Sequence, residues 1–80
     1  MRQPGQAKNK FKLDDLIISR RMFDKNKIVH YRVAMIKHRS LIVDVIKDDK
    51  KVFWTEVPFE ILDDYDYLQT YMEEHPEYFL

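Results

Sequence analysis

The sequence has no cysteine, a single glycine and no long apolar run. The absence of cysteine excludes a disulfide framework, a thiolate zinc site and a cysteine nucleophile, and it favours a reducing compartment. The apolar runs reach three or four residues, whereas a membrane-spanning helix requires roughly 20. The first ten residues contain no apolar segment of the kind found in a signal peptide. We therefore expect a cytoplasmic protein that makes no membrane contact.

Patterns typical of catalysis are also missing. The only glycine, Gly5, does not belong to a phosphate-binding loop, and neither serine follows a strand–turn–helix pattern. The three histidines lack the spacing of metal ligands. We therefore expect no enzymatic activity, no cofactor and no metal. One enzymatic alternative stays open: a metal-free ribonuclease with His30 or His38 as general acid or base and Arg32 or Arg39 stabilising the phosphate.

A strong β pattern occupies residues 28–57. Runs rich in β-branched and aromatic residues predict strands near 28–37, 41–47 and 52–57, with short polar connections of hairpin length between them. Asp44 lies in the middle strand, where burial would require a cationic partner such as Arg20, Arg32 or Lys37. Apolar side chains fall on both faces of the last two strands. We expect the second face to be covered by the C-terminal helix or by a partner; it carries Ile42, Ile46, Val52 and Trp54.

The segments on either side of this β pattern carry composition, capping and spacing features that predict their local structure. Residues 1–10 are polar and basic and predict a disordered arm. Residues 11–23 favour a strand near 16–23, with a short helix from Leu13 as the alternative. Asp63 is a suitable N-cap and Pro76 a suitable stop, so we expect a helix near 63–75. Leu62, Tyr65, Leu68 and Met72 recur at helical spacing and predict its core-facing stripe.

Together these elements predict one small α+β domain over residues 11–80. Its sheet is expected to be an antiparallel meander of three or four strands, open or curled toward a small barrel, with the C-terminal helix packed over it. The aromatic tail after Pro76 either folds back on the domain or stays exposed as a contact.

The formal charge of zero conceals a division between the two halves of the chain. Residues 1–47 contain 12 Lys and Arg against 4 Asp, a net charge of +8, and residues 48–80 contain 2 Lys against 10 acids, a net charge of −8. Such asymmetry is typical of proteins that bind charged partners. The alternative is that the halves neutralise each other within the fold through surface ion pairs.

These observations predict a small non-enzymatic regulatory or inhibitor protein that binds a nucleic-acid-handling protein, RNA or single-stranded DNA. The basic half is expected to face nucleic acid through Arg20, Arg21, Arg32, Lys37, His38 and Arg39. The acidic helix and tail are expected to face a basic protein surface through Asp63, Asp66, Tyr67, Tyr71, Glu73, Glu77 and Phe79. The alternative is a structural subunit that forms homo-oligomers through its oppositely charged halves.

Overall fold

Five antiparallel strands form the framework of the computed structural model, which describes residues 9–21 and 29–79. In chain order the elements are β1 (Leu16–Ser19), β2 (Val29–Ile36), β3 (Ser40–Lys47), β4 (Lys50–Pro58), the 3₁₀ helix η1 (Phe59–Asp64), β5 (Tyr65–Tyr67), α1 (Leu68–Glu74) and the 3₁₀ helix η2 (Pro76–Tyr78).

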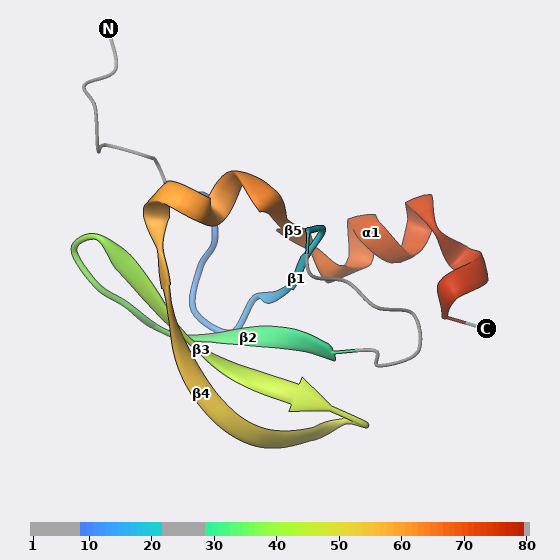
Figure 1. Cartoon of the computed structure of the whole chain (residues 1–80), viewed down its shortest axis with the longest axis horizontal. Coiled ribbons are helices and arrows are strands. Elements are labelled where there is room, and N and C mark those ends of the chain that lie inside the picture. The colour runs from blue at the N-terminus through green and yellow to red at the C-terminus, as the bar shows by residue number, and fades with distance from the viewer. Residues whose placement is uncertain (1–8, 22–28, 80) are drawn as a thin grey trace, which may run out of the picture.

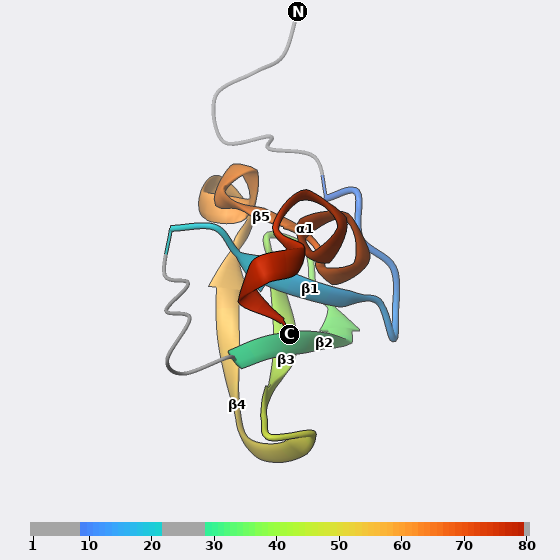
Figure 2. The same ribbon diagram turned by 90° about the vertical axis from the view of Figure 1, so that its right-hand side faces the viewer.

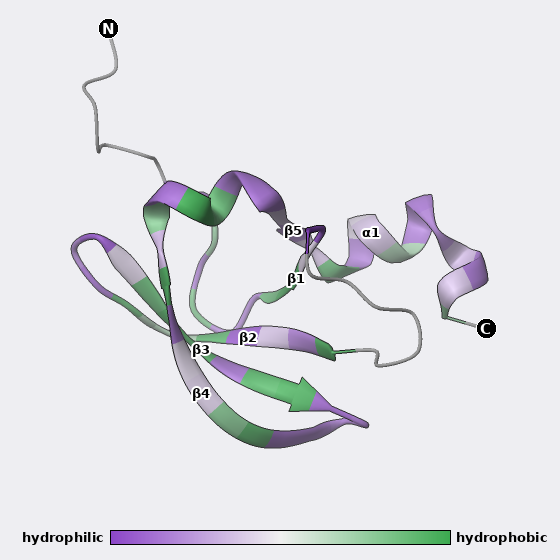
Figure 3. Ribbon diagram, viewed as in Figure 1, coloured by the Kyte–Doolittle hydropathy of each residue, from purple (hydrophilic) through white to green (hydrophobic). Residues whose placement is uncertain are grey.

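The strands lie in the order β4-β3-β2-β1-β5, so the first and last strands are neighbours (Figure 1). The sheet is open, with β4 and β5 at its two edges. β4 and β3 are joined by the two-residue turn Asp48–Asp49, whose φ angles of 52° and 63° lie in the left-handed region that such hairpin turns require. Figure 3 shows the hydrophobic stretches of β3 between hydrophilic turns.

The core lies on one face of this sheet. Val33, Leu41, Val43 and Val57 point to it from β2, β3 and β4, and each is almost fully buried. η1 and β5 close the core from the other side, with contributions from Phe11, Ile17, Leu62 and Tyr65. We call this side of β2, β3 and β4 the core face and the opposite side the outer face.

The helix α1 packs on the far side of β1 and β5, away from the core (Figures 1 and 2). Strand alternation places Ile18 on that side, because its neighbour Ile17 belongs to the core. Ile18 is nevertheless fully buried, and Arg20, two residues further on the same side, binds Glu74 of α1. Hence α1 covers the outer side of β1 and leaves that of β3 and β4 open.

The α+β class predicted from the sequence is confirmed, but the strand count is corrected from three or four to five. The additional strand is β5, in the segment predicted to begin the helix. Tyr65 and Tyr67 pair with Ser19 and Ile17 of β1, and this long-range pairing outweighs the local capping signal at Asp63. The helix therefore starts at Leu68 rather than near residue 63, and the side chain of its N-cap, Tyr67, makes no capping hydrogen bond to the helix.

The predicted core stripe changes with that boundary: Leu62 and Tyr65 are buried, whereas Met72 is exposed and Tyr71 is buried instead. β1 ends at Ser19, before the predicted limit of residue 23. Most of the predicted basic arm lies outside the described residues, as do residues 22–28. Within the described part, no helix is long and apolar enough to cross a membrane.

Candidate protein-binding face

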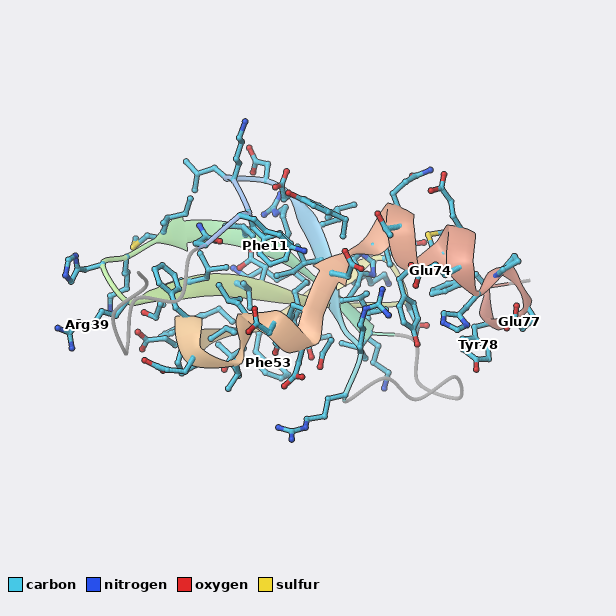
Figure 4. All side chains as sticks on the ribbon, turned by 90° about the horizontal axis from the view of Figure 1, so that it is seen from above. Phe11, Arg39, Phe53, Glu74, Glu77 and Tyr78 are labelled. Carbon is cyan, nitrogen blue, oxygen red and sulfur yellow. The ribbon has the colours of Figure 1, made fainter. Side chains whose placement is uncertain are left out.

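The basic residues predicted to bind nucleic acid are distributed over several elements. Four of them form ion pairs with carboxylates: Arg20 with Asp66 and Glu74 (2.6 and 2.8 Å), Arg21 with Asp64 (3.6 Å), Arg32 with Asp44 (2.8 Å) and Lys37 with Glu56 (3.3 Å). His38 and Arg39 lie exposed in the β2–β3 turn. Figure 4 shows Arg39 at the opposite end of the molecule from Glu77 and Tyr78. The fold therefore does not gather the six residues on one surface.

Several of the residues predicted to bind a protein instead support the packing of α1 and β5. The Tyr67 hydroxyl donates to the carbonyl oxygen of Lys10 (3.0 Å), and its ring meets Phe11 edge-on at 5.0 Å. Tyr71 is buried, and its ring contacts Arg20 and Phe79. Phe79 thus packs against α1, as in the first of the two alternatives predicted for the tail; Leu80 lies outside the described residues.

The acidic members of that set divide into bound and exposed groups. Asp66 binds Arg20 and also lies 3.9 Å from Lys10. Burial alone would raise the pKa of Asp66, but hydrogen bonds from Arg20 and from the Tyr67 backbone outweigh it, so the pKa is lowered. Asp63, Glu73 and Glu77 are exposed. They lie on η1, α1 and η2 and do not belong to one element.

Within residues 9–21 and 29–79, no helix packs on the outer face of β2, β3 and β4. Strand pairing aligns Leu16, Arg32, Asp44 and Trp54 in one row across β1, β2, β3 and β4. Because directly paired residues point to the same side of a sheet, these four side chains share the outer face. The neighbouring row contains Met35, Ile42 and Glu56.

Asp44 is the charged centre of this face. Its carboxylate accepts a hydrogen bond from Arg32 at 2.8 Å and lies 3.2 Å from the Lys51 ammonium group. The hydrogen bond from Arg32 lowers the pKa of Asp44, and Lys51 acts in the same direction, against a smaller opposing effect of burial. Asp44 is only 5% exposed. The predicted need for a cationic partner is met by Arg32.

Large apolar side chains surround this ionic centre. Trp54 is 62% exposed and Met35 is 54% exposed, and Leu16 is also exposed. Ile42 and Ile46 are partly buried between them. Trp and Arg are the residues most enriched at the energetic centres of protein interfaces, and Met adapts its shape to different surfaces. The row thus has the composition of an interface centre.

The sequence predicted an apolar second face on these strands but did not determine which part of it the helix covers. Apolar residues on the second face of the last two strands predicted a cover, either the helix or a partner. The helix contacts β1 and β5 instead, so it is not the cover of β3 and β4. The register shift between Val45 and Ile46 leaves Val52 without a partner on β3, which sequence alternation could not show.

No group of three or more His, Asp or Glu residues within residues 9–21 and 29–79 could hold a metal ion. No family model, no curated protein and no solved structure matches the chain.

Proposed function

We propose that the chain is a non-enzymatic protein-binding module, of regulatory or adaptor type and cytoplasmic, that contacts its partner through the outer face. The observation that carries this proposal is the 62% exposed indole of Trp54, which lies in line with the neutralised Arg32–Asp44 pair. When a partner protein buries an exposed tryptophan that lies beside apolar side chains, the tryptophan can contribute a large share of the binding free energy.

Charge favours a protein partner over nucleic acid at this face. Phosphate binding depends on cations that can release counterions. Arg32 and Lys51 share the carboxylate of Asp44, so this cluster holds one net positive charge. Apolar Leu16, Met35 and Ile42 surround it, and they would be desolvated by a complementary protein surface.

The test uses a photo-reactive amino acid in place of Met35 and two matched variants of β4. Trp54→Ser removes the indole from the outer face, and Phe53→Ser removes an equally exposed aromatic ring (58%) of the adjacent residue, which points to the core face. We expect the reagent at position 35 to crosslink a discrete protein in extracts of the producing cells. Trp54→Ser should abolish the crosslink and Phe53→Ser should preserve it.

Nuclease treatment before irradiation separates a protein partner from a nucleic-acid bridge. A crosslinked protein that persists after nuclease treatment supports the proposal. The proposal would be overturned if Trp54→Ser and Phe53→Ser reduced the crosslink equally. It would also be overturned if the reagent at position 35 gave no more crosslinked product than the same reagent at exposed Lys12.

A second candidate function rests on the β2–β3 turn. Arg39 extends from the end of the molecule (Figure 4), and neither Arg39 nor the neighbouring, exposed His38 forms an ion pair with the described residues. They would give a salt-sensitive contact with RNA or single-stranded DNA. A gel shift of labelled RNA at low ionic strength tests it: Arg39→Gln should weaken the shift, whereas Arg21→Gln, which removes a paired cation, should not.

A further inference from the structure

The outer edge of β4 has unpaired backbone groups at defined positions. In the described residues β4 pairs with β3 alone. The Phe59 amide donates to the Arg39 carbonyl (3.0 Å), which makes Ser40 and Pro58 a pair without mutual hydrogen bonds. Alternation from that point directs the N–H and C=O groups of Glu56 and Trp54 away from β3. Both residues therefore present a donor and an acceptor along the open edge.

The segment that can accept another strand is short and limited at both ends. The register shift at Val52 interrupts β4 on one side, and Pro58, which has no N–H, ends it on the other. Such features are common on edge strands that must not aggregate. Between them, residues 53–57 form a regular stretch with Trp54 near its middle.

The charges of β4 favour an antiparallel copy of the same strand. Lys50 and Lys51 lie at its beginning, and Glu56 lies near its end. Antiparallel pairing brings the cationic end of one strand beside the anionic end of the other, whereas parallel pairing would bring like charges together. Pairing over the regular stretch 53–57 would be centred on Thr55 and place Trp54 of each copy opposite Glu56 of the other, so that their outward N–H and C=O groups bond to one another.

We propose that two copies of this chain associate through their β4 edges, antiparallel and about a two-fold axis at Thr55. The pairing joins the two sheets and their outer faces into one continuous surface. It closes at two copies, because β4 is used on both sides and the other edge strand, β5, has only three residues. This differs from assembly through oppositely charged halves, since many of those charges are paired within one copy.

The inference goes beyond the proposed function and does not depend on it. Partner binding uses the side chains of the outer face, whereas self-association uses the backbone of its edge. Met35→Ser, two strands away from β4, should therefore weaken partner binding and leave self-association unchanged. Glu56→Pro and Glu56→Ala lose the same outer-face carboxylate, so the two variants should bind the partner equally and differ only in self-association.

The experiment is sedimentation equilibrium of the full chain over a wide concentration range. We expect the apparent mass to rise from 9.9 kDa toward twice that value with concentration. Glu56→Pro removes the outward N–H, and Glu56→Ala is the matched control that loses the same carboxylate but keeps the N–H. Because the two-fold axis doubles the lost bond, Glu56→Pro should weaken association at least about tenfold relative to Glu56→Ala.

Hydrogen exchange of the unmodified chain keeps the test decisive if Glu56→Pro fails to fold. The amides of Trp54 and Glu56 should exchange about tenfold more slowly at high than at low protein concentration. The Thr55 amide, which points to β3, should be unaffected by concentration. A chain that stays monomeric at millimolar concentration, or equal exchange of Trp54 at all concentrations, would overturn the inference.

Discussion

At the scale of single residues, the arrangement around Asp44 explains how a carboxylate can lie in the middle of an apolar strand. Arg32 and Lys51 reach it from the strands on either side, β2 and β4. Its charge is thereby neutralised within the sheet and leaves Trp54 and Met35 as the exposed parts of the outer face. The same principle holds at Glu56, which accepts hydrogen bonds from Ser40 and Lys37.

These carboxylates should make stability depend on pH in a defined direction. The pKa of Asp44 is lowered chiefly by Arg32 and that of Glu56 by Ser40, so the folded state favours their charged forms. Their stabilisation is complete above the unfolded pKa values of about 4 and is lost as pH falls through the lower folded values. Urea unfolding followed by circular dichroism at pH 3, 4, 5 and 7 should show the free energy of unfolding falling below about pH 4.5.

Asp44→Asn isolates the contribution of one carboxylate to that profile. The variant keeps the shape of the side chain but leaves Arg32 and Lys51 without their shared anion, so we expect it to be less stable than the parent at pH 7 and to show a flatter pH profile. Asp48→Asn, in the exposed turn, is the control and should change neither the stability at pH 7 nor its pH profile. An unchanged pH profile in Asp44→Asn would contradict the role given to Arg32.

At the scale of elements, the small helix depends on contacts made by β1 and β5 rather than on its own sequence. α1 has seven residues, no side-chain cap and no acidic residue in its first turn. Isolated helices of this length are not stable in water. Arg20 supplies an external anchor, because its guanidinium binds Asp66 and Glu74 and lies 5.6 Å from the centre of the Tyr71 ring.

Arg20→Lys should therefore loosen α1 selectively. Lysine keeps the charge but cannot hold two carboxylates and a ring in the planar geometry of arginine. With allowance for the solvent exposure of these pairs, we expect roughly fivefold faster hydrogen exchange in α1, for example at the His75 amide that bonds to Tyr71. The neighbouring variant Arg21→Lys should leave exchange in α1 unchanged, and no difference between the two variants would remove Arg20 as the anchor.

The β3–β4 turn offers a second prediction at this scale. Asp48 and Asp49 both have positive φ, which costs L-residues energy that glycine does not incur. Asp49→Gly should stabilise the chain by about 0.5–1 kcal/mol, or a few degrees in Tm. Lys47→Gly, in the adjacent strand, should instead destabilise it. Thermal unfolding of both variants measures the contrast, and a loss of stability in Asp49→Gly would contradict the turn geometry.

The elements also show how far the sequence could predict the fold. The meander was predictable because its strands are adjacent in the chain and alternate clearly: strands expected near 28–37, 41–47 and 52–57 correspond to β2, β3 and β4. β5 was not predictable, because Tyr65–Tyr67 become a strand only by pairing with β1, almost 50 residues away. The exposed row around Trp54 was predictable as an uncovered apolar face. Its position depended on where α1 packs, which local patterns do not determine.

At the scale of the whole molecule, the separation of charge along the chain is largely undone by folding. Many ion pairs join a cation from residues 1–47 to an acid from residues 48–80, as between Arg20 and Asp66 and between Lys37 and Glu56. Exposed pairs of this kind contribute little stability each. The single core on one side of the sheet must therefore carry most of the stability of an 80-residue chain.

Leu41→Ala tests that dependence on one core. Leu41 is fully buried, so we expect a loss of about 2–5 kcal/mol in the free energy of unfolding, a large part of the total for a domain of this size. Its cross-strand partner Ile36 is partly exposed, and Ile36→Ala should cost less. Urea titrations read by circular dichroism and by exchange of α1 amides should shift together in Leu41→Ala; separate transitions would indicate two independent units.

The exposure of Trp54 has a practical consequence, since it is the chain's only tryptophan. Its fluorescence in the folded state should resemble that of an indole in water, so unfolding should shift the emission maximum very little. Contact with another macromolecule that covers the indole should shift the maximum to shorter wavelength. The intrinsic emission of this chain would thus record occupancy of the outer face and remain almost silent to denaturation, the reverse of its usual behaviour in small domains.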